Sequence, residues 1–179
     1  MPTVAVLEPA PALAPLLART LSPSLSALAP PERPADLLVL GPDWEAAPDG
    51  LHGPYMGGGP RLGGNPCLGG NPCLGGGPCP PCRILLTPGG SAIRDLSAPS
   101  VVSYGPSPRD TLTFSSLRAG GMVLDLQREI VTLSGRRVER QELALPARGE
   151  PLLTLAWAGT LLLAGVELED LPRLARDSL

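Results

Sequence analysis

Lysine is absent from this 179-residue chain, whose 14 basic residues are all arginines. A phosphate-binding loop of the Gly-Lys-Ser/Thr type needs a lysine to reach the terminal phosphates, and Schiff-base catalysis needs a lysine amine. Both chemistries are therefore excluded for these residues. The single histidine, His52, lies between Gly50 and Gly53 in a loop-like stretch. Because nothing there would hold the imidazole in place, we do not expect His52 to act as a catalytic base.

Aromatic residues are also scarce, at 3% of the chain, and the formal net charge is −3. A nucleic-acid-binding surface normally combines a basic stripe with aromatic side chains that stack on bases. The nearest approach to such a stripe is the group Arg136, Arg137 and Arg140. We interpret this group as the solvated end of a hairpin, with a small basic patch as the alternative. We therefore expect no nucleic-acid partner.

Long apolar runs are missing as well. The uncharged apolar run 152–166 has 15 residues, whereas a bilayer span needs about 20. It therefore predicts a buried core helix. The apolar segment 1–18 carries Glu8 and no basic region, so it does not resemble a secretory signal. We expect a cytoplasmic protein without a membrane partner, in which the four cysteines are thiols or ligands and not disulfides.

The first two thirds of the chain alternate between strand-like and helix-like patterns. Short, continuous apolar runs predict strands buried on both faces at 3–7, 35–40, 83–87 and 100–104. Segment 12–21 has the leucine spacing of a helix, and 92–96 predicts a further helical turn. Such an alternation is typical of an α/β fold, with a Rossmann-like parallel sheet and flanking helices.

The last third has a different pattern. Alternating segments predict neighbouring antiparallel strands at 111–117, 122–133 and 138–145. The apolar run 152–164 predicts a buried helix that ends at Gly165, and 167–171 predicts a short acidic helix. The expected architecture is thus a single α/β domain over 1–179, in which a small antiparallel sheet and a C-terminal buried helix follow the parallel sheet.

Glycine and proline are abundant, with 22 and 24 residues, and many of them fall in a low-complexity repeat at 50–82. From Gly57 the chain reads GGGPRL, GGNPCL, GGNPCL and GGGPCP. This composition predicts a flexible loop with incidental thiols. The alternative is a zinc site, because four thiolates can close a tetrahedral site. Its ligands would be Cys67, Cys73, Cys79 and Cys82.

The loops after the predicted parallel strands form the candidate ligand crevice, since ligands of open α/β sheets bind beyond the carboxyl ends of the strands. Backbone N–H groups of a Gly-Gly-Ser turn could hold an anion there, with arginine charge beside it. An ordinary turn and helix cap is the alternative. Acidic residues near the strand ends, Asp43, Asp95 and Asp110, leave acid–base or magnesium chemistry open. The candidate ligand-binding residues are Gly89, Gly90, Ser91, Arg94, Arg109 and Asp110.

The order of elements in the second half resembles the middle domain of the Mur ligases, the ATP-dependent amide ligases of peptidoglycan precursor synthesis. The resemblance is carried by Val101-Val-Ser-Tyr-Gly105, by 110–117, and by the apolar run 152–166 with Glu167-Leu-Glu-Asp170 after it. It implies a shared shape with loss of ligase chemistry, because the Gly-Lys-Ser/Thr loop and the residues that hold magnesium have no counterparts here.

These observations favour a bacterial-type, non-catalytic cytoplasmic protein without a cofactor. We expect such a protein to bind an anionic small molecule or a protein partner. Two alternatives stay open. One is a zinc-binding module built on the cysteine repeat, and the other is a small enzyme that acts on a phosphorylated substrate through Asp110 and Arg109.

Overall fold

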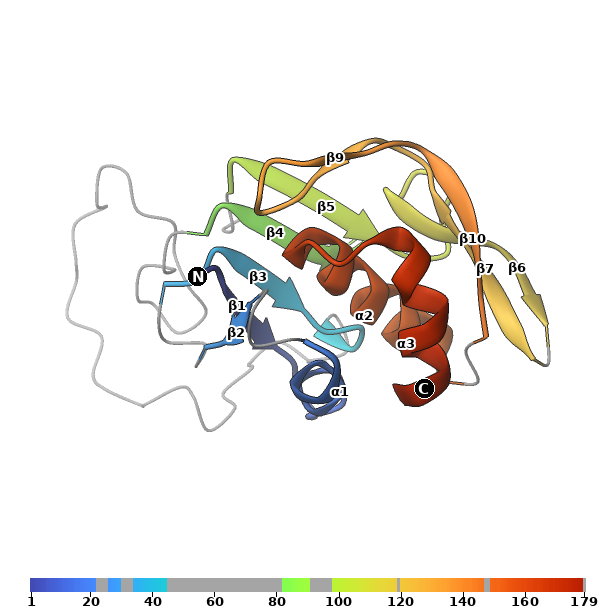
Figure 1. Ribbon diagram of the computed structural model, residues 1–179, viewed down its shortest axis with the longest axis horizontal. Helices are drawn as coiled ribbons and strands as arrows, with labels where there is room; N and C mark the ends of the chain where they lie inside the picture. Colours follow the sequence, from blue (N-terminus) through green and yellow to red (C-terminus); the bar gives the residue numbers. More distant parts are fainter. Residues whose placement is uncertain are drawn as a thin grey trace.

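In the computed structural model, most of the chain forms one α/β assembly (Figure 1). The structure describes residues 1–21, 26–29, 34–44, 82–90, 98–118, 120–146 and 149–178. The strands are β1 (Thr3–Leu7), β2 (Ala27–Leu28), β3 (Leu37–Leu40), β4 (Ile84–Pro88), β5 (Ser100–Tyr104), β6 (Leu112–Arg118), β7 (Gly121–Leu126), β8 (Ile130–Val131), β9 (Arg137–Val138) and β10 (Gln141–Leu145). The helices are α1 (Leu13–Thr20), α2 (Pro151–Ala164) and α3 (Leu171–Ser178), with a 3-10 turn, η2 (Leu168–Asp170), before α3.

Eight strands form one sheet in the order β10-β7-β6-β5-β4-β3-β1-β2. The six strands from β2 to β6 are parallel, and the arrows of β3, β4 and β5 point the same way in Figure 1. The four predicted parallel strands are therefore confirmed. Strand β3 is buried at every residue, as its uninterrupted Leu-Leu-Val-Leu sequence indicates. The α/β class with a mostly parallel sheet follows from these pairings.

The predicted antiparallel strands join the main sheet instead of forming a sheet of their own. Strand β6 pairs in parallel with β5 through Tyr104 and Leu112, and β7 and β10 then continue the sheet in antiparallel order. The expected strand 122–133 is divided between β7 and β8, and the Gln127 N–H extends the β6–β7 pairing by one bond, to Thr111 O at 2.9 Å, before the chain turns to β8. The small separate antiparallel sheet does exist, but it consists of β8 and β9.

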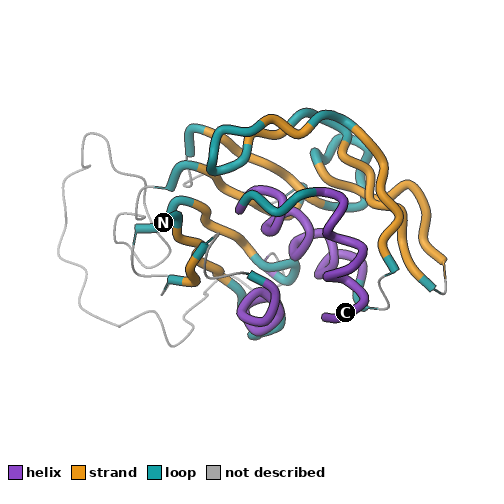
Figure 2. Tube along the Cα trace, in the orientation of Figure 1, coloured by secondary structure: helices purple, strands orange, loops and turns teal. Residues whose placement is uncertain are grey.

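Helices α1, α2 and α3 share one hydrophobic cluster with one face of the sheet, and Figure 2 shows them on the same side of the strands. Helix α2 is buried from Thr154 to Ala164 because its sequence is apolar on all sides. Its Gly159 lies against β4 and β6, where an added Cβ would come within 3.1 Å of Leu86. Gly165 ends the helix with a φ of 105°, a conformation that favours glycine.

The other face of the sheet carries a second, smaller cluster that includes Leu38, Leu40 and Leu85. Trp44 and Cys82 also pack there. No helix of the described ranges is long and apolar enough to cross a membrane.

Candidate functional site

The strand order places the chain's topological switch point between β1 and β3. The chain leaves β1 toward β2 on one side, and β3 lies on the other side of β1. Open α/β sheets bind their ligands beyond the carboxyl ends of the strands at such a point. Here those ends continue into Glu8, Gly41, Gly89 and Gly105. We call this region the carboxyl edge.

Glu8 fills the position where a phosphate would approach helix α1. Its carboxylate accepts hydrogen bonds from three N–H groups at the start of the helix, those of Ala12 (3.1 Å), Leu13 (2.8 Å) and Ala14 (2.9 Å). Free N–H groups and the helix dipole make such a terminus attractive to anions. A Cβ on Gly41 would lie 2.7 Å from the Glu8 Cβ, so the two loops touch. The anion position at α1 is thus occupied by the chain's own carboxylate.

The Asp110 carboxylate occupies the space beside Gly89. Only 5% of this residue is exposed, and its Oδ2 accepts a hydrogen bond from the Ser107 N–H at 3.2 Å. A Cβ on Gly89 would lie 1.9 Å from Asp110 Oδ1, and one on Gly105 would lie 2.5 Å from Oδ2. The Gly89 N–H donates to Tyr104 O at 2.8 Å. This N–H group is therefore not free to bind an external anion.

Glu150 is the second carboxylate that binds a helix N-terminus. It precedes α2 and accepts from the N–H groups of Leu152 (3.0 Å) and Leu153 (2.5 Å). Pro151 follows it at the first helical position, where the missing N–H costs nothing. Helix α2 is thereby capped from within the chain.

Tyr104 lies buried at the carboxyl edge, where nearby carboxylates affect its pKa. Its hydroxyl is fully buried and donates to Leu40 O at 2.7 Å. Burial raises the pKa of Tyr104, and the negative charges of Glu150, Asp43 and Glu8 raise it further. Three carboxylates of the carboxyl edge therefore act on this one hydroxyl.

The structure brings together only part of the predicted ligand-binding set. Gly89 and Asp110 are in contact, and Gly90 is exposed with a φ of 84°. Arg109 is exposed, and its backbone N–H donates to Ser107 Oγ at 3.2 Å. The remaining predicted residues, Ser91 and Arg94, lie outside the described residues, as does Asp95.

Glu8 and Glu150 are the site residues that sequence reasoning missed. Glu150 stands directly before Pro151, and a carboxylate just before a proline at the first helical position is a usable cap signal. Glu8 is harder to find, because it lies five residues before the start of α1 and reaches the helix only through the bend of its loop. Neither glutamate belongs to the preferred N-cap types.

The cysteine repeat falls almost entirely outside the described residues, which include Cys82 but not Cys67, Cys73 or Cys79. Cys82 is half-buried, and burial raises the pKa of its thiol, which disfavours the thiolate that zinc needs. The described part of the chain contains no group of three metal-ligating side chains. The zinc hypothesis stays a prediction.

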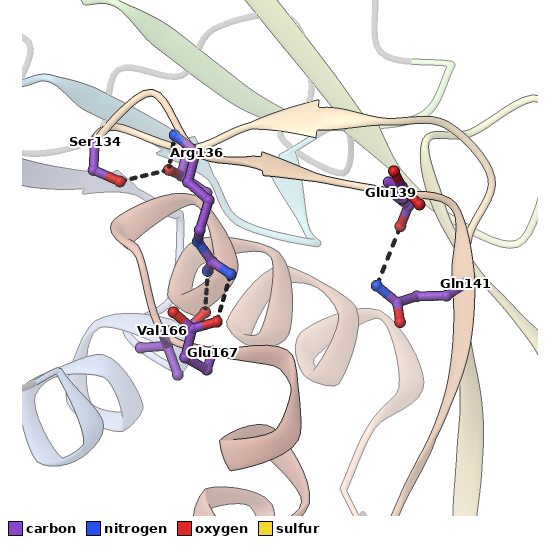
Figure 3. Close-up of polar contacts among 7 residues, drawn as sticks. Ser134, Arg136, Glu139, Gln141, Val166 and Glu167 are labelled. Atoms are coloured by element: carbon purple, nitrogen blue, oxygen red, sulfur yellow. Dashed lines mark hydrogen bonds and ion pairs between the residues drawn. The ribbon is translucent and has the colours of Figure 1, made fainter.

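Arg136 and Arg137 lie on the β8–β9 hairpin, where Figure 3 shows Arg136, and Arg140 follows β9. The Arg136 guanidinium donates to Val166 O at 3.1 Å and pairs with Glu167, beyond the end of α2. Arg137 pairs with Glu129 at 3.0 Å. These contacts engage two of the three arginines within the protein.

Neither a comparison with models of known protein families nor one with curated proteins gives a match. The resemblance to the Mur ligase middle domain therefore stays a prediction from the order of elements.

Proposed function

We propose that this chain is a non-catalytic, cytoplasmic binding module, shaped like a Mur ligase middle domain, that does not take up nucleotide at its carboxyl edge. Its ligand is an anionic small molecule or a protein, bound elsewhere on the surface. One observation carries the proposal: the Glu8 carboxylate accepts hydrogen bonds from three N–H groups at the start of α1. A nucleotide phosphate would have to displace this carboxylate.

Charge supports the same conclusion. Glu8, Asp43 and Glu150 act together on Tyr104 at the carboxyl edge, and Asp110 lies buried beside Gly89. Phosphate would meet like charges there, and like charges at close range repel each other. Enzymes that transfer phosphoryl groups instead place cations and free N–H donors at this position.

Nuclear magnetic resonance tests the proposal directly. ATP, ADP and a sugar nucleotide, each with magnesium, are titrated to millimolar concentration into isotopically labelled protein. We expect no saturable shift of the Ala12, Leu13 and Ala14 amides, and no release of phosphate from ATP. Saturable shifts at these amides, or magnesium-dependent ATP hydrolysis by the purified chain, would contradict the proposal.

A further inference from the structure

A cavity of about 450 Å³ lies at the opposite, amino-terminal edge of the parallel sheet. Its volume falls in the range of about 300–1,000 Å³ that is usual for small-molecule sites. Three parts of the fold form its walls: the starts of β1, β3 and β4, the turn between β8 and β9, and the end of α2. Among its lining residues are Pro2, Asp36, Arg83, Leu133, Ser134 and Ala164.

A backbone hydrogen bond and an arginine side chain tie two of these walls together. The Leu133 N–H donates to Leu163 O at 2.8 Å, which ties the β8–β9 turn to the last turn of α2. Figure 3 shows the second tie, in which Arg136 reaches from the same turn to Val166 and Glu167. The cavity is therefore formed before any ligand arrives, which lowers the entropic cost of binding.

Arg83 and Asp36 bring opposite charges to this cavity. The Arg83 side chain is 63% exposed and forms a loose ion pair with Asp36, whose Oδ1 lies 3.9 Å from the guanidinium, beyond hydrogen-bonding distance. The other oxygen of Asp36 already accepts from the N–H and hydroxyl of Thr3. The guanidinium thus keeps a planar set of donors for a ligand, and this geometry matches one carboxylate.

The negative end of α2 opposes an anion less than a bare helix end would, because the carbonyls of Leu161, Leu162 and Leu163 accept hydrogen bonds within the chain. Leu161 O accepts from the Val166 N–H at 2.9 Å, and Leu162 O accepts from the Gly165 N–H at 3.0 Å. Leu163 O is occupied by Leu133, as described above. Internal donors therefore neutralise most of the partial charge that a bare helix end would present.

Pro2, Leu133 and Ala164 add apolar groups to the lining, beside the polar side chains of Asp36 and Ser134. We propose that the cavity binds a small organic carboxylate, whose carboxylate pairs with Arg83 and whose apolar body lies against Leu133 and Ala164. This inference rests on the proposed function of a non-catalytic binding module, and it adds the site and the class of ligand.

Hexanoate is the probe that tests this site. We expect saturable shifts of the Arg83, Leu133, Ser134 and Gly165 amides, and no saturable shift with neutral hexanamide or with inorganic phosphate. Arg83→Gln weakens hexanoate binding at least tenfold, which corresponds to about 1.4 kcal/mol. Arg83→Lys keeps the charge without the planar donors and gives a smaller loss. Arg118→Gln, the matched control, removes an exposed arginine from β6 and leaves the affinity unchanged.

Several results would overturn the inference: no saturation with millimolar hexanoate, equal binding of hexanamide, tighter binding of phosphate, or equal effects of Arg83→Gln and Arg118→Gln. Thermal melts of each variant show whether it is folded. If Arg83→Gln is unfolded, Arg83→Lys serves as the test in its place. Failure of hexanoate binding leaves the nucleotide experiment untouched. Nucleotide binding at α1, in contrast, would refute the proposed function whatever hexanoate does.

Discussion

The contact between Gly89 and Asp110 gives a quantitative test of the carboxyl edge. An alanine Cβ at position 89 would lie 1.9, 2.4 and 2.5 Å from the three terminal atoms of Asp110, so the whole carboxylate must move. Moving it breaks the hydrogen bond from the Ser107 N–H and crowds a side chain that is 5% exposed. We expect Gly89→Ala to lower the free energy of unfolding by about 2–4 kcal/mol, the sum of overpacking and a lost charge-assisted hydrogen bond.

A double-mutant cycle isolates this contact. Asp110→Ala alone should cost about 1–3 kcal/mol, because it removes the acceptor of the Ser107 N–H. In the Asp110→Ala background the obstruction is gone, so adding Gly89→Ala should cost under about 1 kcal/mol, a coupling of about 1–3 kcal/mol. Urea unfolding, followed by the fluorescence of buried Trp157, measures all four free energies.

Gly120→Ala is the control for this cycle, because a Cβ there meets no atom within 4 Å. It should be neutral, or stabilising by up to about 1 kcal/mol through the unfolded chain. Additive effects of Gly89→Ala and Asp110→Ala would refute the reasoning, as would a Gly89→Ala variant as stable as the control.

Three further predictions concern the same fold. Glu8→Ala removes the acceptor of three N–H groups at α1 and should cost about 0.5–2 kcal/mol in urea unfolding, whereas an unchanged midpoint would contradict that role. Since the pKa of Tyr104 is raised in the folded state, its contribution to stability is complete below the unfolded value and is lost above about pH 10. Tyr104→Phe should therefore flatten the alkaline loss of stability, and an equally steep loss would argue against this assignment. Arg136→Gln should lower the melting temperature less in high salt than in low salt, because an exposed ion pair is screened; salt-independent melting would show that the pair with Glu167 contributes nothing.

The parallel half of the fold could be predicted because its strands are short, apolar and uninterrupted. The Leu37–Leu40 segment has no polar residue at which a solvent-facing side could begin, so burial on both faces was the expected reading. Helix α2 could be predicted as well, since its apolar run is bounded by Pro151 and Gly165. The sheet to which β6, β7 and β10 belong could not be predicted, because alternation indicates a strand but not its neighbour.

The state of the carboxyl edge was also beyond sequence reasoning. Gly89 and Asp110 were both candidate residues, but their contact depends on how the β5–β6 loop folds back. Glu8 looks like a surface glutamate until its loop brings it over Gly41. Long-range packing decides whether such a carboxylate is a ligand-binding group or, as here, an internal cap.

A crystal structure of the chain, grown with ATP and magnesium at millimolar concentration, tests the central claim most directly. Our account predicts that the Glu8 carboxylate still accepts hydrogen bonds from the N–H groups of Ala12, Leu13 and Ala14, with no nucleotide at the carboxyl edge. A triphosphate bound at the start of α1, with Glu8 displaced from those groups, would contradict it.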